Sequence, residues 1–252
     1  MIWRETRNDF RFLGLFLVLL SFLTSHPPMA PAAEEKVAPV AAPKNVAEMK
    51  AMEAKVKGLV AKVTACTVGV RIGAASGSGV IVSEDGLVMT AGHVIGKPGQ
   101  DATIIMPDGK NVKGKTLGLY KNADAGMIQI IDKGKWPFAE KGHSADLRVG
   151  AWCIATGHPL GYVQNRPPVV RVGRVLIVAE NGIQTDCTLV GGDSGGPLFD
   201  LDGTVIGINS RIGGSTLQNF HVPVDIFHES RSRLVTGDSC ENALPTRTAA
   251  DR

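Results

Sequence analysis

The chain has 252 residues, of which 44% are hydrophobic and 20% are charged, and it carries 30 glycines and 14 prolines. This composition is typical of a globular protein and excludes the disordered, fibrous and collagen-like classes. The formal net charge of +3 comes without a long run of lysine or arginine, so we expect no nucleic acid as a partner.

The first thirty residues have the three parts of a secretory signal peptide. Three arginines precede an apolar run over residues 12–23, and small residues follow at 30–33. As a helix, the apolar run would measure about 18 Å, which is shorter than the ~30 Å hydrocarbon core of a bilayer. We therefore predict a signal peptide over residues 1–30, a secreted or periplasmic location and no stable membrane insertion. An uncleaved membrane anchor is the alternative.

An alanine- and proline-rich linker is predicted over residues 31–44, followed by a segment with helical periodicity. Asn45 and Glu48 resemble a capping box, and apolar residues recur at helical spacing as far as Val63. We predict an amphipathic helix over residues 45–63. Its apolar face either lies on its own domain, which is the favoured interpretation, or contacts another subunit.

From residue 64 onward the periodicity becomes that of short β-strands. β-branched runs alternate with turn signals such as Glu84-Asp85-Gly86 and Leu201-Asp202-Gly203. Six runs lie on each side of the stretch 136–150, which indicates two six-stranded halves. The pattern predicts an all-β domain over residues 64–235 but does not choose between a barrel and a sandwich. Residues 236–252 are predicted to form a flexible tail.

The cysteine spacing does not favour a metal site. The chain has four cysteines and no Cys-x-x-Cys, whereas zinc sites are commonly built from closely spaced pairs. An even number in an exported protein allows one or two disulfides, and simple burial as small apolar residues is the alternative. The pairing therefore stays open among Cys66, Cys153, Cys187 and Cys240.

Three residues have the chemistry that nucleophilic catalysis needs. His93 follows a predicted strand and Asp124 precedes another, and for either residue taken alone a structural role is the favoured interpretation. Ser194 is different, because it lies among four glycines in the segment 191–197. Glycine leaves backbone amides uncovered, and such amides stabilise the oxyanion that forms when a serine attacks a carbonyl. No lysine follows these glycines, which excludes a phosphate-binding P-loop.

The order histidine, aspartate, serine matches a known acyl-transfer arrangement, and further motifs surround each of the three residues. These motifs are Gly77–Val82, Leu87–Val94, Asp124–Ile128, Ala155–Gly161, Ile183–Asp186 and Gly207–Asn209. With them in order, the sequence resembles the trypsin-like serine proteases, and more closely their HtrA/Deg branch, over roughly residues 58–228.

The resemblance implies an all-β fold of two six-stranded antiparallel barrels with a short N-terminal helix. It implies a serine protease domain over residues 45–235, with the helix at 45–63, the barrels at 64–235 and the site in the cleft between them. HtrA-type enzymes usually carry a PDZ domain, but too few residues follow His228 for us to expect one in this chain.

The resemblance also implies a role for each site residue. Ser194 would attack the scissile carbonyl, His93 would act as general base and then general acid, and Asp124 would orient the imidazole. The backbone N–H groups of Gly192 and Ser194 would form the oxyanion hole. Neither a metal nor an organic cofactor is implied, and the partners would be protein or peptide substrates.

The primary substrate pocket is implied only by family analogy. Its expected residues are Thr188, Ile208, Asn209, Ser210, Phe220 and His221. Thr188 is uncharged, so a preference for lysine or arginine lacks its usual carboxylate, and we expect small or medium aliphatic side chains instead. His221 either touches the pocket or is hydrogen-bonded within its strand, and the second interpretation is favoured.

Two aspartates near the serine lack an assigned role. Asp193 stands where HtrA-type enzymes usually carry asparagine and where digestive proteases carry aspartate. In digestive proteases this aspartate pairs with an amino terminus freed by cleavage before an Ile-Val-Gly-Gly motif, which is absent here. Asp193 therefore needs another partner or faces water. Asp186 also matches the family pattern, and its role does not follow from the sequence.

Taken together, the sequence predicts an exported serine endopeptidase that hydrolyses unfolded proteins through an acyl-enzyme. One alternative is a catalytically inactive or chaperone-like binding protein on the same scaffold, which the complete set of catalytic residues disfavours. Another is a narrowly specific processing protease, which the sequence does not distinguish from a general one. The resemblance also suggests a homotrimer, for which residues 45–63 are the candidate contact.

Overall fold

The computed structural model describes residues 40–240 of the chain. The predicted signal peptide over residues 1–30, most of the predicted linker and residues 241–252 lie outside this range. Within residues 40–240, no helix combines the length and the apolar character that crossing a membrane requires.

Helix α1 (Val46–Ala65) begins at the predicted capping residues. The Asn45 side chain accepts a hydrogen bond from the Glu48 amide at 2.9 Å, and the Glu48 carboxylate accepts one from the Lys44 amide at 2.6 Å. These bonds satisfy backbone donors that have no partner within the helix, so the local sequence defines where α1 starts.

Helix α1 buries little of its surface against the rest of the protein. Val63 is its one buried residue, while Lys55 pairs with Asp202 at 2.8 Å. Val46 and Met49 remain exposed near the start of the helix. The association of several copies through α1 stays a prediction.

The first barrel is an antiparallel sheet in the order β5-β4-β1-β2-β3-β6, closed by pairing of β5 with β6. The strands alternate buried and exposed residues where one side faces solvent, as β5 does over its first half. The bounds are β1 Thr67–Ile72, β2 Ala75–Ile81, β3 Leu87–Ala91, β4 Asp101–Ile105, β5 Asn111–Tyr120 and β6 Ala125–Ile130.

The second barrel closes in the order β10-β11-β12-β9-β8-β7. Its strands also pair antiparallel throughout. The predicted fold of two six-stranded antiparallel barrels is therefore confirmed. The bounds are β7 Trp152–Gly157, β8 Val169–Ala179, β9 Gly182–Thr185, β10 Pro197–Phe199, β11 Val205–Ile212 and β12 Asn219–Pro223.

The two barrels share packed side chains. One core cluster contains Met89 and Met127 of the first barrel together with Ile154 and Phe199 of the second. At the same junction, the buried hydroxyls of Thr67 and Thr156 lie 2.7 Å apart across the boundary. Close packing of this kind fixes the two barrels against each other, which matters because the predicted catalytic residues come from both.

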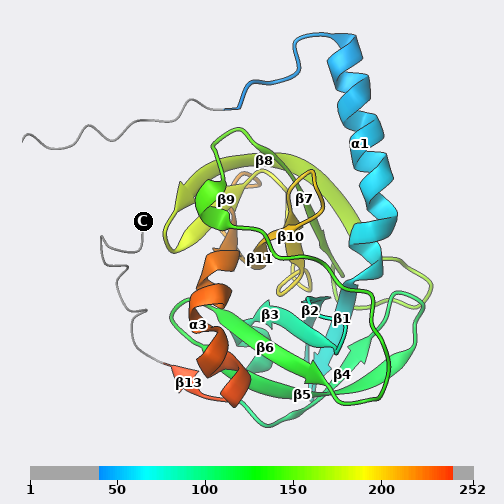
Figure 1. Cartoon of the computed structure of the whole chain (residues 1–252), viewed down its shortest axis with the longest axis vertical. Coiled ribbons are helices and arrows are strands. Elements are labelled where there is room, and N and C mark those ends of the chain that lie inside the picture. The colour runs from blue at the N-terminus through cyan, green and yellow to red at the C-terminus, as the bar shows by residue number, and fades with distance from the viewer. Residues whose placement is uncertain (1–39, 241–252) are drawn as a thin grey trace, which may run out of the picture. The chain divides into compact units, whose positions relative to one another are not determined.

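A C-terminal helix was missed by the sequence analysis. α3 (Val224–Thr236) buries residues that recur at helical spacing, and it ends at Gly237, whose φ of +86° is the usual left-handed cap. It contacts β5 and β6 of the first barrel and β11 and β12 of the second, along the edge opposite α1 in Figure 1.

A short strand, β13 (Ser239–Cys240), follows α3 and pairs parallel with the end of β5. Thr236 ends α3 and residues 239–240 form β13, so the predicted tail boundary at residue 236 falls too early. The end of β5 has an edge that β4 does not cover, and the chain pairs with this edge through β13 after it leaves α3.

The described cysteines are buried thiols. Cys66, Cys153 and Cys187 are free, and the sulfurs of Cys153 and Cys187 lie 3.9 Å apart without a bond. Their burial supports the interpretation of small apolar residues. The side chain of Cys240 lies outside the described part of the chain.

Candidate active site

Strand pairing in the first barrel brings His93 beside Asp124. His93 lies in α2 (Gly92–Ile95), a single helical turn that directly follows β3, and Asp124 is the last residue before β6. β3 pairs antiparallel with β6 along its whole length, so the end of β3 meets the start of β6. The Gly92 amide donates to the Asp124 carbonyl at 2.8 Å and fixes this junction.

The backbone of Asp124 adopts an uncommon conformation. Its φ is +58°, in the left-handed region that few residues other than glycine enter, although aspartate does so more readily than most. Such strained residues persist only where the surrounding structure holds them, and they gather at functional sites. Here the strain turns the carboxylate toward the histidine.

The Asp124 carboxylate is held by three donors. His93 Nδ1 lies 3.0 Å from both carboxylate oxygens, and the His93 backbone amide donates to Oδ1 at 2.9 Å. The Ser210 hydroxyl donates to Oδ2 at 2.6 Å. Because Nδ1 carries the proton in this bond, the Nε2 atom of His93 is left as the basic nitrogen.

These contacts shift the pKa of both residues. Burial works against ionisation of Asp124, but the hydrogen bonds from His93 and Ser210 hold the pKa of its carboxyl below the usual range. The hydrogen bond to Asp124 raises the pKa of His93, against the opposing effect of partial burial. The aspartate therefore stays ionised and stabilises the protonated imidazole.

Ser194 lies in the loop between β9 and β10 of the second barrel, and backbone bonds fix that loop. The Ser78 amide donates to the Ser194 carbonyl at 2.8 Å, and the Gly195 amide donates to the Asn209 carbonyl at 2.7 Å. Gly195 has a φ of +86°, and a Cβ there would lie 2.1 Å from Thr90 Oγ1. Only glycine fits this position.

Two amides beside Ser194 are available to a substrate. Within residues 40–240, neither the Gly192 N–H nor the Ser194 N–H has a hydrogen-bond partner. The carbonyl of Gly191 accepts from the Leu160 amide at 2.6 Å. The Gly191 carbonyl and the Gly192 N–H belong to the same peptide group and point in opposite directions. The bond to the Gly191 carbonyl therefore turns the Gly192 N–H away from Leu160. Free amides of this kind can stabilise an oxyanion.

The Ser194 hydroxyl is turned toward a neighbouring carbonyl. It donates to the Ser210 carbonyl at 3.4 Å, and among the described residues no hydrogen bond joins it to His93. The structure thus brings His93 and Asp124 together and places Ser194 next to Ser210, which bonds both Ser194 and Asp124. Hydrogen bonds between catalytic groups are often long or misaligned before substrate binds.

Ser78 positions the serine loop, and the sequence analysis did not single it out. Its side chain is fully buried, donates to the Gly192 carbonyl at 2.8 Å and accepts from the His158 amide at 2.9 Å. It therefore fixes the serine loop to the first barrel. The available signal was its place in Gly77-Ser78-Gly79, because a polar residue between two glycines in a buried strand needs partners from elsewhere.

The structure supplies the missing partner of Asp193. The carboxylate is fully buried, and the Arg171 guanidinium from β8 contacts both of its oxygens, at 2.9 and 3.2 Å. The Val190 amide donates to it at 2.9 Å. Burial raises the pKa of Asp193, while the Val190 amide and Arg171 act in the opposite direction. The sequence held one indication of this pair, because Arg171 lies on the same face of β8 as the buried Gly173 and Val175.

Asp186 has a structural task. Its Oδ1 accepts a hydrogen bond from the Arg174 amide at 2.5 Å, at a point where β8 and β9 change register. A Cβ on Gly173 would lie 2.3 Å from the same oxygen, so glycine makes room for it. Asp186 therefore satisfies a strand amide rather than lining the cleft.

The pocket beside Ser194 differs from the predicted one. It has a volume of about 260 Å³ and is lined by Leu189, Val190, Gly191, Ser194, Asn209, Ser210, Arg211 and Ile212. Of the predicted residues, Asn209 and Ser210 line it. Thr188 is exposed outside this pocket, and Ile208 is fully buried in the core. The pocket beside Ser194 therefore shares only part of the set expected from family analogy.

Phe220 and His221 line a separate cavity of about 270 Å³. Both ring nitrogens of His221 are used, since Nδ1 lies 2.9 Å from Asn209 Oδ1 and Nε2 lies 2.8 Å from Thr185 Oγ1. Burial lowers the pKa of His221 to about 3, so the ring is neutral at ordinary pH. His221 thus lies outside the pocket beside Ser194 and is hydrogen-bonded, as in the interpretation that the sequence analysis favoured.

Comparison with known proteins agrees with this geometry. A family model of the trypsin-like peptidase domain matches residues 77–208, and the chain therefore belongs to this family. Solved structures with the same architecture include an HtrA-type protease, AlgW, with tripeptide. That structure has a TM-score of 0.64 and 26% sequence identity, and the match covers 72% of this chain and 64% of the other.

Curated relatives include proteins named as probable periplasmic serine endoproteases of the DegP-like type. The protein from Halomonas elongata is 38% identical over 167 residues, which cover 63% of this chain and 35% of the relative. The protein from Pseudomonas fluorescens is 36% identical over 170 residues, which cover 64% of this chain and 35% of the relative. The chain thus spans about a third of the length of these relatives.

We predict that Asp124→Asn lowers the pKa of His93, because it removes the carboxylate that raises it. Activity that needs a neutral His93 should rise as pH increases through this pKa, which lies above the ordinary ~6.5. NMR titration of the histidine ring in a Ser194→Ala background measures the pKa directly. A His93 pKa that is unchanged by Asp124→Asn would contradict the assignment.

We predict that Arg171→Met lowers the free energy of unfolding by about 3–5 kcal/mol, because it leaves the buried Asp193 without its counter-charge. The double variant Arg171→Met/Asp193→Asn should recover most of this loss, since no buried charge then remains unpaired. Urea unfolding of both variants in a Ser194→Ala background measures the difference. Equal destabilisation of the single and double variants would show that packing, not charge, is responsible.

Proposed function

We propose that this chain is an exported serine endopeptidase that hydrolyses peptide bonds in unfolded proteins. The observation that carries the proposal is the His93–Asp124 pair beside a serine loop with two unpaired amides. Membership of the trypsin-like peptidase family supports it. The names of the relatives, which describe periplasmic endoproteases, support the exported location and the choice of proteins as substrates.

The proposed reaction begins when the Ser194 hydroxyl turns from the Ser210 carbonyl toward His93. His93 Nε2 accepts the hydroxyl proton while Ser194 Oγ attacks the scissile carbonyl carbon. The resulting oxyanion accepts hydrogen bonds from the Gly192 and Ser194 amides, each of which lowers the barrier by about 3 kcal/mol. His93 then gives its proton to the leaving amine.

The second half of the reaction regenerates the enzyme. Water attacks the acyl ester on Ser194 while His93 takes a proton from it. The bond between the acyl carbon and Ser194 Oγ then breaks as His93 returns that proton to Oγ, which releases the acid product. Asp124 stays ionised throughout, because the three donors that surround its carboxylate stabilise the charged form. Its role is to keep the proton on Nδ1 and to stabilise the imidazolium.

We predict that Ser194→Ala abolishes casein hydrolysis and also abolishes covalent labelling by an organophosphonate. The alanine variant should fold normally, because the Ser194 hydroxyl makes one long hydrogen bond. The decisive comparison is mass spectrometry of the labelled wild-type and variant proteins. Absence of both hydrolysis and labelling in the wild type would favour an inactive, chaperone-like binding protein on this scaffold.

We propose that the primary pocket accepts aliphatic side chains. Leu189, Val190 and Ile212 contribute apolar walls, and the lining includes no carboxylate that could pair with a substrate lysine or arginine. Burying an unpaired cation costs several kcal/mol, so the discrimination should be large.

We predict that peptides with valine, alanine or leucine before the cleaved bond react at least about 100-fold faster in kcat/KM than those with lysine or arginine. Digestion of a denatured proteome, followed by sequencing of the new termini, gives the profile in one experiment. Many aliphatic sites would support a general degrading protease, whereas one or two strict sites would indicate a processing protease.

A further inference from the structure

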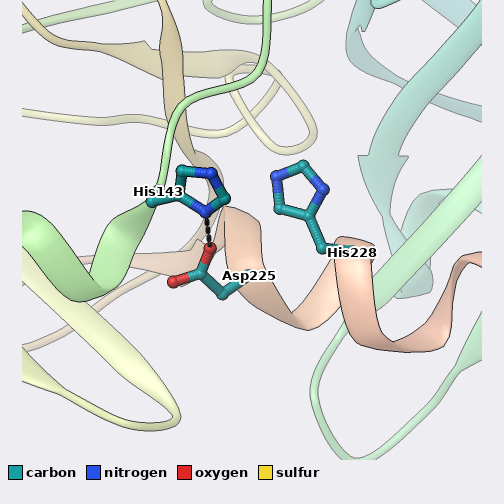
Figure 2. Close-up of side chains that lie close together, drawn as sticks. All are labelled: His143, Asp225 and His228. Carbon is teal, nitrogen blue, oxygen red and sulfur yellow. Dashed lines mark ion pairs between the residues drawn. The ribbon is translucent and has the colours of Figure 1, made fainter. Parts of the chain in front are cut away.

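Three side chains that are remote in the sequence gather beside the C-terminal helix. His143 precedes the short helical turn η1 (Ser144–Asp146) in the segment that connects the two barrels. Asp225 lies in the first turn of α3, and His228 follows three residues later on the same face. Figure 2 shows the His143 ring at the Asp225 carboxylate, with the His228 ring beside it on the same side of the helix.

The three side chains are close enough to share one ion. A ligand atom from each lies within 4.8 Å of the ligand atoms of the other two. His143 Nδ1 and Asp225 Oδ1 are 3.4 Å apart. Neighbouring ligands of a tetrahedral zinc ion, with bonds of ~2.0 Å, are separated by about 3.3 Å. The distance between His143 Nδ1 and Asp225 Oδ1 therefore already fits two ligands of one zinc ion. Rotation of the His228 side chain can bring its ligand atom to a similar distance.

The Asp225 carboxylate has one oxygen without a hydrogen-bond donor. Oδ2 accepts from the Ala145 amide at 2.8 Å, which fixes the orientation of the carboxylate. Oδ1 is buried, and within residues 40–240 it accepts no hydrogen bond. Its polar neighbour is His143 Nδ1 at 3.4 Å, which lies outside hydrogen-bond geometry, so Oδ1 can still accept a ligand placed between the two side chains.

The two imidazoles are arranged around the same space. Their rings are stacked, with centroids 5.3 Å apart and planes inclined by 27°. Asp225 pairs with His143, whereas His228 Nε2 donates a hydrogen bond to the Gly142 carbonyl at 3.0 Å. This bond holds the His228 ring beside the pair and brings a further oxygen to the edge of the group.

We propose that His143, Asp225 and His228 form a Zn²⁺ site that ties α3 to the segment connecting the barrels. Two imidazole nitrogens and one carboxylate oxygen suit zinc, whereas Ca²⁺ and Mg²⁺ prefer oxygen ligands alone. Water or the Gly142 carbonyl takes the fourth position. Because α3 contacts both barrels, an ion here stabilises the junction of the whole domain, independently of the proposed peptidase activity.

Zinc binding is measured on the full chain with Ser194→Ala, which prevents self-digestion, after the protein has been stripped of metal. Calorimetric titration should show one high-affinity equivalent. Zn²⁺ at about 100 times its Kd should raise the melting temperature by roughly 5–10 °C. Absence of both a binding isotherm and a thermal shift would overturn the proposal.

Two histidine variants locate the ion. His143→Ala should weaken Zn²⁺ binding at least about 100-fold, because even loss of a supporting residue around a metal ligand costs ~10–100-fold. His143 is exposed, so this variant should retain its fold, and circular dichroism provides the check. His93→Ala is the matched control, since His93 and Asp124 form another histidine–aspartate pair, and it should keep full affinity.

The outcome that contradicts the proposal is equally specific. Zinc binding that survives His143→Ala but disappears in His93→Ala would place the ion at the catalytic pair instead. The visible spectrum of bound Co²⁺ provides a second readout, because four-coordinate nitrogen and oxygen ligation has its own absorption. This spectrum should be lost in His143→Ala and retained in His93→Ala.

Discussion

The contact between the serine loop of the second barrel and Ser78 of the first is the constraint on which the site depends. The Ser78 amide binds the Ser194 carbonyl, and its hydroxyl binds the Gly192 carbonyl, so both halves of the loop are fixed to the barrel that carries His93 and Asp124. A catalytic arrangement tolerates displacements of only about 0.5 Å. The shared core and the C-terminal helix serve the same end, because they hold the barrels in one relative position.

The buried charge of Asp193 places a second constraint on the conformation of the serine loop. A fully buried aspartate next to the nucleophile is stable only with a cation, and Arg171 provides one from a neighbouring strand. The cation belongs to the folded chain, so the loop conformation requires no amino terminus freed by cleavage. The same carboxylate accepts the Val190 amide, which couples the pocket wall to the charge pair. Asp193 therefore links a wall of the pocket beside Ser194 to the loop that carries the two free amides.

The two histidine–aspartate groups of the protein differ in surroundings and hence in proposed task. His93 pairs with a carboxylate that has donors on both oxygens and therefore orients a proton. Asp225 Oδ1 lies 3.4 Å from His143 outside hydrogen-bond geometry, and His228 offers a second imidazole within 4.8 Å, which suits a metal ligand set rather than a proton relay. The first group lies where the barrels meet the serine loop, and the second lies where α3 meets the connecting segment.

The sequence by itself predicted the capped helix α1 and an all-β domain of two six-stranded halves, because capping residues, strand periodicity and turn residues are local signals. From short motifs that resemble a known family, the sequence further predicted the barrels and the candidate triad of His93, Asp124 and Ser194. It did not reveal α3, the partner of Asp193, the pocket walls or the group at His143. Each of these depends on which residues meet after the chain has folded, as when Arg171 reaches Asp193 or when His143 meets His228. Only the tertiary structure decided them, because contacts between distant segments leave no spacing rule in the chain.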